Sequence, residues 1–112
     1  MAFTYGYCPR VDMYVESPNG VPFMVDVKGL SIHTFWPIKH CLEDKDLYFI
    51  LVLVPEVDNP RYFILSSRDL NAEIRRYRDY ALKKGLNYKP EWGGFNCSYA
   101  LPYEDRWDAL WN

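Results

Sequence analysis

Hydrophobic and polar residues alternate along residues 10–28, a pattern typical of β-strands with one covered face. Two alternating runs flank Pro18-Asn19-Gly20, which suits a three-residue hairpin loop with proline opening a type I turn and glycine in the left-handed conformation. With this loop, Ser17 faces Val21 and Asp12 faces Asp26. A two-residue loop at positions 19 and 20 would move Asp12 to the apolar face. The pattern therefore favours the three-residue loop.

The expected register gives the hairpin two different faces, because side chains on a strand alternate. Between the Ser17–Val21 pair and the Asp12–Asp26 pair, the expected cross-strand pairs are Glu16 with Pro22, Val15 with Phe23, Tyr14 with Met24, and Met13 with Val25. The apolar face carries Val11, Met13, Val15, Phe23, Val25 and Val27, and the other face carries Asp12, Tyr14, Met24, Asp26 and Lys28.

Further strands and one helix follow the hairpin. Residues 31–36 can form a short strand, residues 47–54 are continuously apolar as in a strand covered on both faces, and residues 61–65 read as a strand returning beside it. A helix is expected near residues 68–84, with Ser67 as its N-cap and Gly85 at its end. Its apolar side combines Leu70, Ile74, Tyr77 and Ala81.

The remaining residues, 86–112, are rich in aromatic side chains and are expected to wrap the sheet as a C-terminal tail. Packing explains these aromatic residues best, although stacking on single-stranded or flipped bases is an alternative. The pattern as a whole predicts one α/β domain over residues 1–112, with a mixed β-sheet and one main helix.

Composition limits the classes of function. The chain has 112 residues, 18% aromatic residues and a net charge of −2, so it has no overall attraction for polyanions. Its three cysteines are far apart, which is typical of reduced thiols in a cytoplasmic protein. No apolar run is long enough to cross a bilayer, and the N-terminus lacks the pattern of a signal peptide. We expect a cytoplasmic protein.

Two facing carboxylates are the first candidate for chemistry. Asp12 and Asp26 would repel each other across the hairpin unless a cation lay between them. Oxygen ligands suit Mg²⁺ or Mn²⁺, and Lys28 on the same face could orient a water molecule or stabilise charge on a phosphate. The alternative is an ordinary solvated strand face, which commonly carries aspartate and lysine.

The segments around the hairpin resemble a known superfamily. Pro9-Arg10-Val11-Asp12, followed by the hairpin and Val25-Asp26-Val27-Lys28-Gly29, is similar to the core of PD-(D/E)xK nucleases. Residues 46–54, 61–67 and 101–108 resemble other prokaryotic members, so the likeness extends from about residue 9 to the C-terminus.

The resemblance implies a minimal restriction-endonuclease-like αβββαβ fold, related to Holliday-junction resolvases, and metal-dependent phosphodiester hydrolysis. It implies Asp12, Asp26 and Lys28 as catalytic residues. It further implies that Asp12, Asp26 and the carbonyl of Val27 hold Mg²⁺ or Mn²⁺. The substrate would be DNA or RNA.

This chain departs from the family at its beginning. Members usually open with a helix that covers the sheet and often carries a further glutamate, whereas residues 1–8 are short and aromatic and precede Pro9. The sheet surface left uncovered would be buried by the C-terminal tail, by a second copy in a homodimer, or by a different protein partner.

Two other functions remain open for this reason. One is a catalytically silent nuclease-fold protein of phage or mobile-element type that binds a protein or a nucleic acid, for example an inhibitor of a host defence system. The other is a structural domain that assembles with itself.

The outer face of the expected helix is locally basic. It carries Arg75, Arg76, Arg78 and Lys83, which are the best candidates in the chain for contacts to a nucleic-acid backbone. A solvated helix face is the ordinary explanation for such residues. His33 is more typical of a hydrogen-bonded surface residue than of a ligand.

Overall fold

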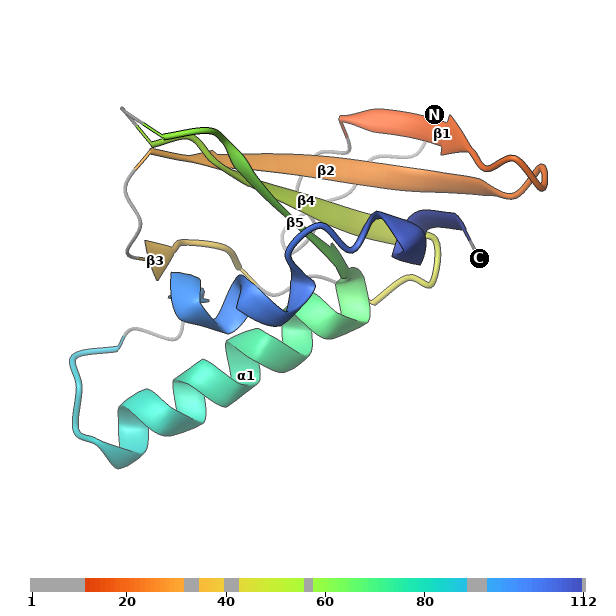
Figure 1. The fold of residues 1–112 in the computed structure, drawn as a ribbon. Helices are drawn as coiled ribbons and strands as arrows, with labels where there is room; N and C mark the ends of the chain where they lie inside the picture. The colour runs from red at the N-terminus through yellow and green to blue at the C-terminus, as the bar shows by residue number, and fades with distance from the viewer. Residues whose placement is uncertain (1–11, 32–34, 40–42, 56–57, 89–92, 112) are drawn as a thin grey trace.

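The structure is a computed structural model that describes residues 12–31, 35–39, 43–55, 58–88 and 93–111. A mixed four-stranded sheet forms its centre, in the order β1-β2-β4-β5, and one long helix packs against it (Figure 1). The sheet strands are β1 (Met13–Glu16), β2 (Pro22–Leu30), β4 (Leu47–Leu53) and β5 (Arg61–Ser66), and the helix is α1 (Ser67–Lys83). The predicted α/β class, with a mixed sheet and one main helix, is confirmed.

Smaller elements complete the structure. The strands β3 (Phe35–Trp36) and β6 (Phe95–Asn96) pair with each other, and the 3-10 helices η1 (Cys97–Tyr103) and η2 (Trp107–Trp111) follow β6. The expected strand over residues 31–36 is thus observed only at its end, and residues 32–34 lie outside the described residues. It joins a separate two-stranded ribbon instead of the main sheet. Within the described chain, no helix is long and apolar enough to cross a membrane.

The hairpin register agrees with the prediction. β1 and β2 are antiparallel, and the four pairs run from Met13 with Val25 to Glu16 with Pro22. The Ser17 N–H donates to the Val21 carbonyl over 2.9 Å, and Gly20 has a φ of 79°. The loop therefore has three residues with glycine in the left-handed position, as expected from the turn chemistry.

Strand β4 is one of the two inner strands of the sheet. It runs parallel to β2 and antiparallel to β5, and five of its residues are buried: Leu47, Phe49, Ile50, Leu51 and Leu53. Burial on both faces confirms the interpretation of its continuous apolar sequence.

The N-terminal end of α1 differs from the prediction by one residue. Ser66, not Ser67, is the N-cap, and its side chain accepts a hydrogen bond of 3.0 Å from the Asp69 N–H. Ser67 is buried, and its hydroxyl group accepts from the Asp44 N–H and donates to the Asp44 carbonyl. Capping preference is the same for two adjacent serines, so the sequence does not distinguish them as N-cap. The hydrogen bonds of Ser67 to the backbone of Asp44 leave Ser66 as the N-cap.

The C-terminal end of α1 is formed as expected. Gly85 has a φ of 71°, and its N–H donates to the Leu82 carbonyl, while the Leu86 N–H donates to the Ala81 carbonyl. These two bonds satisfy carbonyls that the helix leaves open, in the arrangement of a Schellman motif. The predicted apolar side is also confirmed, since all four of its residues are buried.

The sheet separates two hydrophobic cores. The larger core lies between the sheet and α1, η1 and the β3–β6 ribbon, and includes Phe49, Phe63 and Leu70. The smaller core lies on the opposite face, where Leu110 of η2 packs with Val25 and other sheet residues. Both faces of the sheet therefore have apolar neighbours from within the chain.

The C-terminal segment passes from one face to the other at the β5 edge. Glu104 forms a β-bridge with Phe63, and the Asp105 N–H donates to the Tyr62 carbonyl over 2.9 Å. The Arg61 guanidinium donates two hydrogen bonds, of 2.8 and 2.7 Å, to the Glu104 carboxylate. Figure 1 shows this segment in blue, beside β5 and above α1.

Candidate functional site

Strand β2 places Asp26 and Lys28 on the same face, because residues two apart on a strand point the same way. The Lys28 Nζ lies 3.2 Å from Asp26 Oδ2. Asp26 is only 2% exposed, whereas the Lys28 side chain is half-buried. The site is thus a buried carboxylate next to a cation that retains access to solvent.

Asp12 approaches the same place from the end of β1. Its N–H donates to the Val25 carbonyl over 3.0 Å, and Met13 is also paired with Val25. Two residues of one strand face one residue of the other, as in a β-bulge. The strand pairing therefore ends one residue before the expected pair of Asp12 and Asp26. The Asp12 Oδ2 instead accepts a hydrogen bond of 2.7 Å from the Val27 N–H.

The carbonyl of Val27 lies on this same edge of β2. The N–H and C=O groups of one strand residue point to the same side of the strand, and the Val27 N–H points to Asp12. Met24, an odd number of residues away, directs its N–H to the opposite side, toward the Asp46 carbonyl. The three oxygen atoms expected to bind a metal ion, from Asp12, Asp26 and Val27, are consequently neighbours.

Burial changes the acidity of Asp26. It raises the pKa of this carboxyl from 3.8 to about 6, and the Asp12 carboxylate acts in the same direction while Lys28 partly opposes both. The Lys28 contact is an ion pair without the geometry of a directed hydrogen bond, so among the described residues no hydrogen-bond donor serves the buried Asp26 Oδ2. Two carboxylates thus share a small space with one ammonium group.

These oxygen atoms meet part of the coordination that a hard cation requires. Carboxylate and carbonyl oxygens are the ligands that Mg²⁺ and Mn²⁺ prefer, and Asp26 Oδ2 accepts no hydrogen bond from the part of the chain that the structure describes. No cluster of three or more histidine, cysteine, aspartate or glutamate residues occurs within the described ranges. Water or phosphate oxygens would have to complete the coordination of an ion held by Asp12, Asp26 and Val27, as is common for Mg²⁺.

The burial of Asp26 was not foreseen from the sequence. The face of the hairpin with Asp12 and Asp26 was expected to be polar, but Met24 of that face packs against the larger core. Asp26 is paired with Phe49 of β4, and the Phe49 side chain is fully buried. The continuous apolar sequence of β4 was the available signal, because a strand beside it shares its covered faces.

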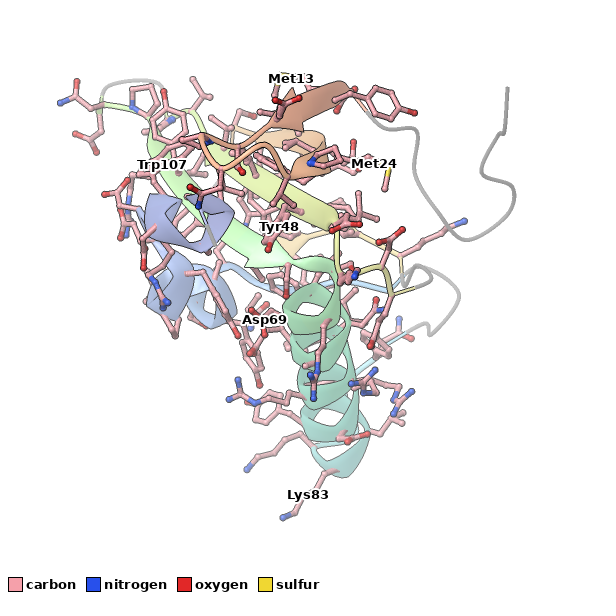
Figure 2. All side chains as sticks on the ribbon, turned by 90° about the vertical axis from the view of Figure 1, so that its right-hand side faces the viewer. Met13, Met24, Tyr48, Asp69, Lys83 and Trp107 are labelled. Carbon is pink, nitrogen blue, oxygen red and sulfur yellow. The ribbon has the colours of Figure 1, made fainter. Side chains whose placement is uncertain are left out.

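The basic residues of α1 are mostly engaged with carboxylates. Arg75 lies 3.8 Å from Glu43, and Arg78 lies 3.3 Å from its neighbour Asp79. Lys83 is exposed at the end of α1 and points away from the sheet (Figure 2). The two arginines are therefore already partly neutralised.

Arg76, whose side chain is 65% exposed, belongs to a cluster around a buried carboxylate that the sequence did not reveal. Glu73 is 6% exposed, and its carboxylate accepts hydrogen bonds from Arg76 and, over 2.7 Å, from the Tyr103 hydroxyl. The Arg76 guanidinium also lies 5.1 Å from the centre of the Tyr99 ring. The cluster joins η1 to α1, so Arg76 has a structural role in addition to the expected contact with a phosphate.

No protein-family model matches the chain, and no curated protein and no solved structure matches it either.

Proposed function

We propose that this protein is a small metal-dependent nuclease of the PD-(D/E)xK type that hydrolyses phosphodiester bonds in nucleic acid. The proposal depends on one observation, the convergence of Asp12, Asp26 and Lys28 at one edge of the hairpin. The resemblance of the same residues to the nuclease motif supports it. A cytoplasmic location agrees with the cysteine usage.

The residues of the site would have two roles, metal binding and stabilisation of negative charge. A bound Mg²⁺ or Mn²⁺ ion supplies a Lewis acid and an acidified water molecule. Asp12, Asp26 and the Val27 carbonyl would hold it. Lys28 is half-buried next to Asp26, so its ammonium group can donate to a phosphate oxygen and stabilise the negative charge that develops there.

The topology supports the proposal in part. The described chain has a mixed sheet in which β4 runs parallel to β2, the strand that carries Asp26 and Lys28. The order of elements differs from αβββαβ, since α1 follows the antiparallel strand β5. We therefore propose a reduced member of this fold.

Metal binding and cleavage test the function together. Calorimetry with Mg²⁺ and Mn²⁺ should detect binding to the natural chain and to Asp58→Asn, a control at an exposed aspartate, but not to Asp26→Asn. In cleavage assays with DNA and RNA, Asp26→Ala and Lys28→Ala should each reduce the rate by at least about 100-fold, within the range for loss of a charge-stabilising group. An undiminished rate in either folded variant rejects the assignment.

A second candidate is binding without cleavage. It is favoured by the observation that Lys28 is paired with Asp26 and that the described site has only two carboxylates. The partner would be a protein or a nucleic acid, as for an inhibitor of phage or mobile-element origin, or a second copy in a homodimer. A partner that binds equally well to the Asp12→Ala, Asp26→Ala double variant, which lacks the metal ligands, supports this candidate over the nuclease.

A further inference from the structure

The face of the sheet opposite α1 carries no charged side chain on any of its four strands. Side chains alternate along a strand, so this face follows from the residues of the smaller core. Its positions are apolar, aromatic or small throughout, from Met13 in β1 to Tyr62 in β5. A sheet face in contact with water normally carries polar residues at such positions. The sequence of this face is therefore that of a covered surface.

The described chain covers only part of this face. Figure 1 shows η2 near the hairpin end of the sheet, where Leu110 packs with Val25 and Ile64, which are each 1% exposed. Farther from η2, exposure increases. Five side chains, which we call the open patch, are between 36% and 50% exposed: Met13, Val27, Val54, Tyr62 and Trp107. The smaller core thus continues into open surface, like one half of a complete core.

The centre of the open patch is continuous across three strands. Gly29 of β2 pairs with Val52 of β4, and Val52 pairs with Tyr62 of β5. Val54 continues the same face two residues beyond Val52. The Trp107 ring adjoins Tyr62, with 5.6 Å between the ring centres. These residues form one apolar surface, not a set of scattered side chains.

Gly29 is explained neither by backbone conformation nor by packing within the described chain. Its φ lies outside the left-handed region, and a Cβ atom built on it would meet no atom within 4 Å. A glycine inside a strand weakens the strand, and it often marks a place where another backbone approaches closely. Glycine at this position leaves room for a further layer directly on the sheet.

Charge and area both favour a second copy of the chain as this layer. Two uncharged surfaces meet without repulsion, and homodimer interfaces are more apolar than those between proteins that also exist separately. The open patch leaves roughly 400 Å² of apolar surface per copy, at about 200 Å² for a fully exposed large side chain. A homodimer interface of about 1200 Å² in total, of which about 65% is apolar, needs a similar area from each copy.

We propose that this protein forms a homodimer in which the open patches of two copies pack face to face, with the two sheets as its inner layers. Sheets that pack in this way lie about 10 Å apart with their strands nearly aligned. Asp26 and Lys28 alternate with Val25 and Val27 along β2, so both candidate sites lie on the faces away from the interface. The homodimer is therefore independent of the proposed nuclease function.

The mass of the protein in solution tests the homodimer. Sedimentation velocity at increasing protein concentration should show a change from the mass of one chain to that of two. Val54→Lys places a charge in the interface and should raise the dissociation constant by at least about 10-fold, because an unpaired charge is costly to bury. Leu82→Lys is the matched control. Leu82 is also exposed, but it lies near the end of α1, so this variant should leave the constant unchanged.

Gly29→Phe is a second variant that tests the centre of the patch. The ring has space in a single chain but fills the space that the second sheet needs, so the dissociation constant should again increase. Circular dichroism at low concentration confirms that both variants are folded.

Two results would overturn the proposal. One is a natural chain that stays monomeric at the highest concentration, which would assign the patch to residues 1–11 or to another protein. The other is a dimer with the same dissociation constant in the natural chain and in both folded variants, which would place the interface elsewhere. Neither measurement involves metal or nucleic acid, so a failure of the homodimer is distinguishable from a failure of the nuclease proposal.

Discussion

The charge on Asp26 should destabilise the folded protein at neutral pH when no metal is present. The folded pKa of about 6 lies above the usual value of 3.8, so the folded chain holds this proton more tightly than the unfolded chain does. The contribution of Asp26 to stability is therefore greatest below pH 3.8. It decreases between about pH 4 and 6, and is constant at higher pH.

The size of this effect follows from the two pKa values. Their difference, converted at about 1.36 kcal/mol for each tenfold change in the ionisation constant, gives about 3 kcal/mol. Asp26→Asn removes the charge but keeps the shape of the side chain. Because Lys28 loses its partner in the variant, we expect a net gain of about 1 to 3 kcal/mol in the free energy of unfolding at pH 7–8, and almost none at pH 4.

Urea unfolding of both proteins at several pH values between 4 and 8, in the presence of a chelator, measures this difference. Other carboxylates titrate in the same range, so the difference between the variant and the natural chain isolates Asp26. Asp58→Asn, at an exposed aspartate, is the control for the substitution itself. A constant difference for Asp26→Asn from pH 4 to 8, or a variant that is less stable at pH 8, would refute the reasoning.

Three further substitutions test the contacts that hold the fold together. Ser66→Ala removes the N-cap of α1 and should lower the free energy of unfolding by about 1 kcal/mol in urea titration. Tyr103→Phe removes one hydrogen-bond donor from the buried Glu73 carboxylate. The free energy of unfolding should fall by about 1–3 kcal/mol, also measured by urea titration. Gly85→Ala should lower the thermal midpoint, because alanine is strained at a φ of 71°, whereas Gly29→Ala, at an open position without positive φ, should have little effect.

For each of these three predictions, one result would contradict the reasoning. An unchanged Ser66→Ala protein would mean that water replaces the cap. Equal stability of Tyr103→Phe would mean that Arg76 alone satisfies the Glu73 carboxylate. Equal thermal midpoints for the two glycine variants would remove the argument from backbone strain.

The predictable parts of the fold were those fixed by neighbours in sequence. The Pro18-Asn19-Gly20 loop determines the hairpin register locally, so Met13 could be paired with Val25 without knowledge of the rest of the chain. The same holds for Gly85 at the end of α1 and for the apolar side of the helix.

The parts that could not be predicted depend on distant residues. Trp36 pairs with Phe95, and no local pattern in residues 31–36 indicates a partner so far along the chain. The burial of Asp26 depends on which face of the sheet α1 covers, and alternation along a strand distinguishes two faces without saying what covers them. Alternation along β2 was enough to expect Asp26 and Lys28 on one face, but the raised pKa of Asp26 was not anticipated.

The crossing of the C-terminal segment over β5 has a consequence for synthesis in the cell. Arg61 and Glu104 are 43 residues apart, so at about 5–20 residues per second the ribosome makes β5 on the order of seconds before its covering segment. During this interval the edge of β5 can pair with a neighbouring unfinished chain. The contacts of Glu104 should therefore influence the yield of folded protein during translation, beyond their effect on the stability of the finished molecule.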